Sequence, residues 1–226
     1  MNAAFANLLA ATSAFVVLHF AMSGALRRPL IRALGRSMFM LTYSMVSIGT
    51  FAWAIVAFDR MPSAPLLWDG MHPLAWLTGS VLTVAALAML LPSFARNPAL
   101  PGAKAAGLGT VIPNGVFTIT RHPMMWGITL WALAHVIVAP SARVIVLMTG
   151  MIVLALAGSH LQDKRKLAGN AREFAPWQRR TSFWPQIRNL GAIKLVWLAS
   201  LILWTLLTWV HWHFFGIPAG LWMWIG

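Results

Sequence analysis

The chain has 226 residues, of which 59% are hydrophobic and only 9% are charged. A soluble domain carries about 25% charged residues, so this composition indicates an integral membrane protein with essentially no soluble domain. The chain contains no cysteine, which excludes disulfides, thiolate metal ligands and a cysteine nucleophile.

Apolar segments of spanning length follow one another along the chain. A helix that crosses a membrane needs about 20 mostly apolar residues. The segments that qualify are 3–22, 37–58, 73–91, 122–139, 142–160 and 192–215. They predict an all-α integral membrane bundle of about six transmembrane helices, which forms a single domain over residues 1–226.

The positive charge is distributed unevenly between the connecting segments. Of the 17 Lys and Arg residues, 15 lie in 23–36, 92–121 and 161–194, and the other two are Arg60 and Arg143. The positive-inside rule therefore predicts that the basic loops are cytoplasmic and that both termini are outside. The net charge of +13 is explained by this topology and by contact with anionic membrane lipid, and we expect no nucleic-acid partner.

The two longer basic connections differ in character. The segment 92–121 contains several prolines and glycines and is predicted to be irregular. In the last connection, Glu173–Arg180 predicts a short amphipathic helix at the membrane interface, with Phe174 and Trp177 on one face. A solvated basic loop is the simpler alternative for that stretch.

A polar octet, Thr120 to Gly127, begins the fourth apolar segment and contains Arg121, His122 and Pro123. Ionisable groups at a membrane boundary are costly and usually face a cavity, a headgroup or a cofactor. The octet therefore predicts a site. Arg121 can bind a heme propionate or a lipid phosphate bidentately, and topological anchoring is the simpler interpretation of this residue.

Histidines occur at two depths in the predicted bundle. His19, His122 and His160 all fall near the cytoplasmic face and form one candidate layer for binding a heme iron or another metal through neutral imidazole. His135 lies 13 residues beyond His122, which is roughly 20 Å along a helix. By depth His135 belongs with His211 and His213, although a lone intramembrane histidine more often hydrogen-bonds another helix.

The acidic residues offer little for acid–base chemistry. Asp59, Asp69, Asp163 and Glu173 all lie outside the predicted spans. We therefore expect no buried carboxylate that could act as a general base.

Two stretches carry a family resemblance. Phe117–Gly127, followed by Leu130–His135, resembles the core of the NnrU family, which includes bacterial NnrU and plant 15-cis-zeta-carotene isomerase. His19 followed by Ser-Gly-Ala-Leu-Arg, and the stretches 163–167 and 180–185, extend the resemblance over about residues 15–190. The resemblance implies a six-helix, multi-pass protein of the bacterial inner (cytoplasmic) membrane.

The resemblance also implies a cofactor and an activity. It implies a heme-binding protein. The role implied is either a cis–trans isomerase of a carotenoid-like polyene or a factor in nitrogen-oxide metabolism. Matching positions makes His19 and His135 the axial ligands of heme b, with His122, Arg121 and His160 as further cofactor-binding residues. The predicted depth in the membrane instead pairs His19 with His122 or His160. The pair from position matching and the pair from depth both stay open.

One residue departs from the isomerase pattern. A cysteine three residues before the second axial histidine is thought to act there in a redox ligand switch, and this chain has Ala132 at that position. A thiolate switch is therefore absent, which puts isomerisation by that mechanism in doubt. The partners expected are membrane lipid and an apolar small molecule, and the sequence indicates no oligomeric state.

The octet is similar to a second family as well. Arg121-His122-Pro123 resembles membrane methyltransferases of the isoprenylcysteine carboxyl methyltransferase type, which bind S-adenosylmethionine. The aromatic scaffold of that family persists downstream, but its paired acidic residues are here Asp163 and Lys164. Methyl transfer from S-adenosylmethionine is therefore an alternative function, and a non-catalytic membrane subunit is a third.

Overall fold

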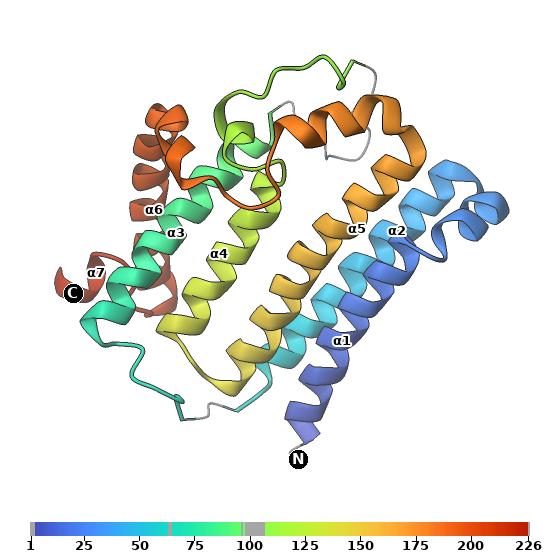
Figure 1. Cartoon of the computed structure of the whole chain (residues 1–226). Coiled ribbons are helices and arrows are strands. Elements are labelled where there is room, and N and C mark those ends of the chain that lie inside the picture. The colour runs from blue at the N-terminus through green and yellow to red at the C-terminus, as the bar shows by residue number, and fades with distance from the viewer. Residues whose placement is uncertain (1–2, 63–64, 96, 98–106, 226) are drawn as a thin grey trace.

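The computed structural model describes residues 3–62, 65–95, 97 and 107–225. These residues contain no β-strand, so the predicted all-α architecture is confirmed (Figure 1). The helices are α1 (Ala3–Ser23), α2 (Arg27–Asp59), α3 (Pro73–Ser93), η1 (Gly115–Thr118), α4 (Pro123–Val138), α5 (Ala142–Arg180), η2 (Ile187–Ile193), α6 (Lys194–Phe215) and α7 (Trp222–Ile225).

Each of the predicted spans coincides with a helix. Five helices among the described residues are long and apolar enough to cross a membrane: α1, α2, α3, α5 and the continuous η2–α6 segment. Helix α4 is apolar but shorter, at 16 residues. It begins directly after His122, because Pro123 is suited to the first helical position and lacks the N–H that would go unpaired there. The chain is therefore a multi-pass helical membrane protein.

The basic segment 23–36 is helical rather than a loop. Helix α2 starts at Arg27, after a turn of three residues, and continues through a kink at Gly35. Gly35 has a φ of 75°, a left-handed conformation that costs a glycine little. The kink lets the basic first turns of α2 bend away from the apolar helix that follows.

The amphipathic helix expected at 173–180 is present as the end of α5. The backbone leaves helical geometry at Asn170 and then resumes the helix to Arg180. Phe174 and Trp177 are buried and pack in one cluster with Phe117. The apolar face of this segment therefore packs against protein. The preceding irregular connection is confirmed from residue 107 onward, and residues 98–106 lie outside the described residues.

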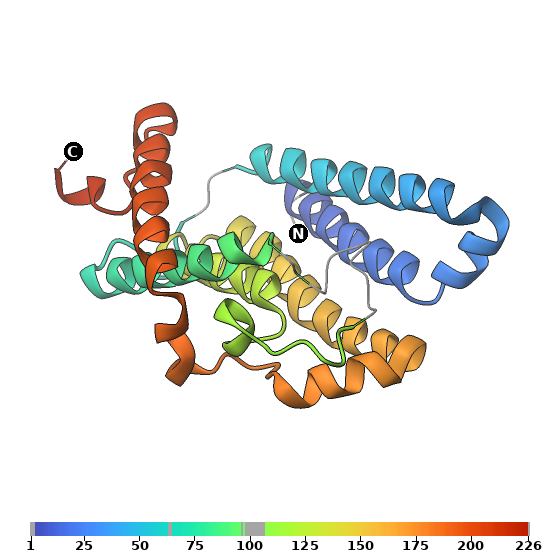
Figure 2. The same ribbon diagram turned by 90° about the horizontal axis from the view of Figure 1, so that it is seen from above.

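The helices form a row rather than a closed ring. Helix α4 lies between α3 and α5, while α1 packs on α5 and pairs with α2 (Figure 1). Helix α6 crosses α3 at a steep angle (Figure 2). The turn between α1 and α2, η1 and the last turns of α5 lie at one end of the bundle, called here the basic end. This order of helices determines which side chains can meet in one site.

Close approach of α3 and α4 depends on a glycine. A Cβ on Gly127 would lie 2.9 Å from the main-chain oxygen of Ala86, closer than packed atoms tolerate. We expect Gly127→Val to lower the free energy of unfolding by about 1–3 kcal/mol, since overpacking forces the two helices apart. Thermal unfolding in detergent, followed by circular dichroism, measures the change.

The matched control is Gly49→Ala in α2, where an added Cβ would meet nothing within 4 Å. That change should be neutral or stabilising by up to about 1 kcal/mol, because alanine is the better helix former. Equal unfolding temperatures for Gly127→Val and the unchanged protein would contradict the close contact between α3 and α4.

Candidate functional site

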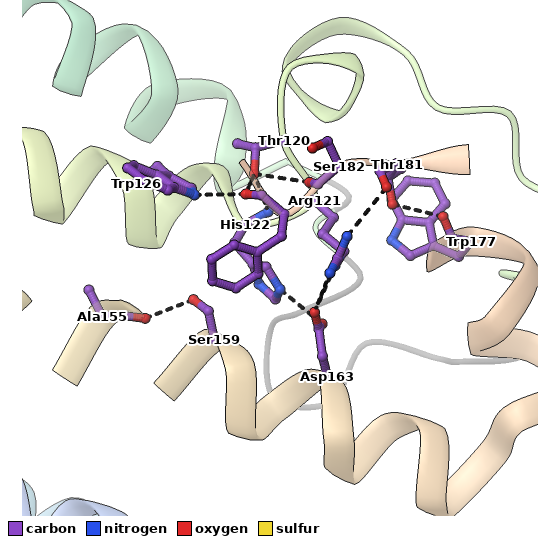
Figure 3. A network of polar contacts seen from close by, with 11 residues as sticks. Thr120, Arg121, His122, Trp126, Ala155, Ser159, Asp163, Trp177, Thr181 and Ser182 are labelled. Carbon is purple, nitrogen blue, oxygen red and sulfur yellow. Dashed lines mark hydrogen bonds and ion pairs between the residues drawn. The ribbon is translucent and has the colours of Figure 1, made fainter. Parts of the chain in front are cut away.

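A buried ionic network joins the start of α4 to α5 at the basic end (Figure 3). Asp163 Oδ2 accepts a hydrogen bond of 2.7 Å from Arg121 Nε and lies 2.7 Å from Arg121 Nη2. The other carboxylate oxygen of Asp163 lies 2.9 Å from His122 Nε2. Both interactions on Asp163 arise because Arg121 and His122 are consecutive residues directly before the first turn of α4.

The network is closed to solvent. Asp163 and His122 are each only 4% exposed, and the Arg121 side chain is 10% exposed. Asp163 lies beyond the apolar part of α5, which ends at His160. Burial by itself would raise the pKa of the Asp163 carboxyl, but hydrogen bonds from His122 and Arg121 and their electrostatic attraction hold this pKa below its usual value.

A peptide segment after α5, called here the strap (residues 181–186), covers the network. Arg121 N donates to Ser182 O at 2.8 Å, and Gln186 N donates to Ile119 O at 2.8 Å. The indole of Trp126 donates to Phe183 O at 2.8 Å. The strap thus pairs its backbone with the residues just before α4, and it excludes water from the ion pair.

His122 keeps one ring nitrogen without a partner among the described residues. With Nε2 directed at Asp163, the buried Nδ1 atom has no hydrogen-bond partner. The Phe183 ring packs on the imidazole with its centre 5.5 Å away. An unsatisfied buried nitrogen costs free energy, so His122 is held here by its ion-paired neighbours and by packing.

This network bears on two expectations from the sequence. The Arg121 guanidinium, expected to bind a propionate or a lipid phosphate, is engaged by Asp163 and by Thr181 O at 3.3 Å. The expectation that no carboxylate is buried is wrong, since Asp163 is buried. A usable signal was present: Asp163 is an acidic residue at the start of a run of cations, one helical turn after the apolar span.

A second site is an apolar cavity between α3, α4 and α6. It has a volume of about 380 Å³, within the range of small-molecule sites. Its wall is mostly apolar and includes three indoles and two imidazoles: Trp76, Trp131, Trp204, His135 and His211. The C-terminal segment closes the cavity, because the Trp76 indole donates to Gly220 O at 2.9 Å. None of the lining residues comes from α1 or α2.

The two imidazoles in this cavity are oriented in the same way. His135 Nδ1 lies 2.8 Å from Trp131 O, and His211 Nδ1 lies 2.7 Å from Leu207 O. A carbonyl oxygen can only accept, so each Nδ1 carries a proton, and Nε2 is the nitrogen that has a lone pair in the neutral form of each ring. This is the tautomer that binds a metal through Nε2, with the other nitrogen oriented by a backbone carbonyl. The predicted depth in the membrane placed His135 with His211, and the structure brings these two histidines to one cavity.

The other histidines lie elsewhere. His19 Nε2 is 2.6 Å from Tyr43 OH, between α1 and α2. His160 is exposed, and His213 stacks on Trp209 with ring centres 4.9 Å apart. The candidate layer of His19, His122 and His160 is therefore not gathered into one site. Among the described residues, no group of three or more His, Cys, Asp or Glu side chains could hold a metal ion.

The fold and these sites define a multi-pass helical membrane protein with an ionic network at one end and an apolar intramembrane cavity. The family model described as "NnrU protein" matches residues 7–219. The chain belongs to the NnrU family.

The chain is also similar to the chloroplastic 15-cis-zeta-carotene isomerase of Zea mays. The two are 26% identical over 184 residues, which cover 79% of this chain and 49% of the maize protein. The chain thus matches about half the length of this relative. No solved structure matches the chain.

Acid should weaken the ionic network. Because the folded-state pKa of Asp163 is lowered, its contribution to stability is fully present above its unfolded pKa of about 3.9 and is lost as the pH falls through the folded value. We expect the unfolding temperature to fall on the acid side of pH 4, and to fall less in Asp163→Asn, which carries no such carboxyl. Parallel pH profiles for both proteins would contradict this assignment.

Proposed function

We propose that this protein binds heme at the α3–α4–α6 cavity, that an apolar polyene approaches this cavity from the lipid phase, and that the protein acts as a cis–trans isomerase in the bacterial cytoplasmic membrane. The observation that carries the proposal is the cavity, an apolar chamber at membrane depth that holds two imidazoles with free Nε2 lone pairs. The substrate class follows from the name of the maize relative. An apolar substrate reaches such a chamber from the lipid phase.

The donor set of the cavity favours heme over a bare metal ion. Two imidazoles are too few ligands for a bare transition-metal ion, which takes four or more. They are sufficient for an iron whose other positions are filled by a porphyrin. His135 and His211 are therefore the residues that would hold heme. When bound, heme supplies one-electron chemistry.

We infer that the pair of axial ligands suggested by position matching, His19 and His135, does not bind one iron. His19 is bonded to Tyr43 in the α1–α2 hairpin, and α5 lies between that hairpin and α4 (Figure 1). His135 lines a cavity that α1 does not reach. The proposal therefore assigns the second imidazole to His211.

The chain's own side chains can bind and orient a long apolar molecule. Trp204 uses its indole N–H to donate to Thr83 Oγ1 at 3.0 Å, and Trp76 donates to the backbone as described. The polar edges of these rings are thus satisfied inside the protein, and the rings line the cavity, where a conjugated chain can pack on them. An apolar wall of this kind also excludes water from the cavity.

The test uses the whole chain purified in detergent from heme-replete cells. We expect a Soret band in the visible spectrum, and conversion of 15-cis-zeta-carotene in reconstituted vesicles, followed by chromatography of the isomers. Ser80 lines the cavity. The Ser80→Leu variant should therefore slow the conversion, because the larger side chain fills the cavity. The exposed Ser44→Leu variant is the control.

Other results would reassign the protein. A colourless preparation that binds S-adenosylmethionine would favour a methyltransferase and overturn the proposal. A colourless preparation that binds neither ligand would favour a non-catalytic membrane subunit. A heme-containing protein that leaves the carotene unchanged would retain the cofactor and overturn the isomerase activity.

A further inference from the structure

A cationic corner lies at the basic end, where the α1–α2 turn meets α5. Arg165 on α5 donates a hydrogen bond from Nη1 to the main-chain oxygen of Ser23, the last residue of α1. Arg27 begins α2 four residues later, and its guanidinium lies 5.6 Å from the centre of the Phe39 ring. The corner thus brings together two guanidinium groups from helices that are distant in sequence.

The two arginines carry like charge at the same corner, because Arg165 is bonded to Ser23 and Arg27 follows four residues later. Loss of hydration in the surrounding protein, and then the like charge of Arg27, lower the pKa of the Arg165 guanidinium. Both groups remain charged, because a guanidinium does not lose its proton in proteins. Two cations held at one corner of the membrane boundary favour binding of an anion there.

The chain has no acidic residue to place there. It contains four Asp and Glu residues, and each of them lies away from this corner or is bonded to another group. Asp163 is engaged by the ionic network, and Glu173 accepts a hydrogen bond of 2.8 Å from the Gly109 amide. Asp59 ends α2, and Asp69 precedes α3, both at the opposite end of the bundle. An anion that binds this corner therefore comes from outside the chain.

The surface beside the corner is suited to acyl chains. Beyond the kink in α2, four apolar side chains at helical spacing form an exposed stripe. Each of them is more than half exposed: Met38, Leu41, Met45 and Ile48. In a membrane-spanning helix these side chains face lipid. A ligand at the corner therefore has a charged end at the membrane surface and an apolar surface continuing into the bilayer.

We propose that Arg27 and Arg165 together bind the phosphate of an anionic phospholipid whose acyl chains lie along the exposed stripe of α2. Guanidinium groups bind phosphate oxygens bidentately, and the positive-inside distribution of charge places this end at the anionic leaflet. A bound phosphate would neutralise both cations and fasten the α1–α2 hairpin to α5. This site is separate from the α3–α4–α6 cavity and does not depend on the proposed function.

The test measures thermal unfolding of the full chain in detergent during titration with phosphatidylglycerol. We expect the lipid to raise the unfolding temperature, and Arg27→Gln and Arg165→Gln each to weaken the apparent affinity about fivefold. Arg28→Gln is the matched control, because Arg28 is a neighbouring exposed arginine. Phosphatidylcholine and inorganic phosphate at the same concentrations are the comparison ligands.

Each alternative result overturns the proposal in a defined way. An equal loss of affinity in Arg28→Gln would show only general surface charge, and an equal effect of inorganic phosphate would show a simple anion site. If a variant is too unstable to titrate, phosphatidylglycerol that copurifies with each protein is extracted and quantified. Equal amounts per protein in Arg165→Gln and Arg28→Gln would then reject the site.

Discussion

Asp163→Ala should lower the free energy of unfolding by about 3–5 kcal/mol, the usual cost of removing one partner from a buried ion pair. The variant leaves the buried Arg121 guanidinium without its carboxylate, and it removes the partner of His122 Nε2. Because Arg121 and His122 precede α4, the start of that helix and the strap should loosen together. Chemical unfolding in mixed micelles measures the free energy.

The control for this prediction is Asp59→Ala, because Asp59 is an exposed acidic residue at the end of α2. That variant should change stability by less than about 0.5 kcal/mol. The double variant Arg121→Met/Asp163→Leu should be less damaging than Asp163→Ala, because it removes both charges instead of stranding one. If Asp163→Ala and Asp59→Ala are equally stable, the network contributes nothing to the fold.

His135→Ala and His211→Ala should each reduce the heme bound per protein by about tenfold or more, since losing an imidazole ligand weakens binding at least as much as losing its hydrogen-bond partner. This prediction depends on the proposed function. Both side chains enter the same cavity with Nε2 free, so removing either leaves a heme iron with one protein ligand. The Soret absorbance relative to protein concentration measures the loss.

Two histidines outside the cavity provide the controls. His213→Ala should retain heme, because His213 stacks on Trp209 and does not line the cavity. His19→Ala should retain heme for the same reason, although position matching to the family makes His19 a ligand. Loss of the Soret band in His19→Ala alone would restore the pair His19 and His135 and reject His211. Recovery of the band in His135→Ala with free imidazole would support a missing ligand over misfolding.

Much of the fold could be predicted because it depends on local composition. Each apolar run of spanning length became a helix, and Pro123 marked the start of α4. One error lies where charge was taken as a sign of a loop. Arg27 and its neighbours form a short helical segment, which a kink at Gly35 separates from the apolar part of α2.

The candidate sites were only half predictable. Depth along each helix grouped His135 with His211 correctly, because depth follows from residue count and rise. Depth also grouped His19 with His122, and here it was insufficient, since α5 lies between α1 and α4 and each imidazole bonds a different partner. The burial of Asp163 was missed because a charged residue past the apolar span looks solvated until its partners are known.

By itself, the sequence determined that this chain is a multi-pass helical membrane protein and where its helices lie, because the transfer of apolar residues into lipid depends on composition and length alone. The tertiary structure alone decided that Asp163 neutralises Arg121 and that His211, not His19, shares a cavity with His135. Those pairings depend on the rotation of each helix about its axis and on which helices are neighbours. Packing between helices sets both, and the position of a residue along the chain sets neither.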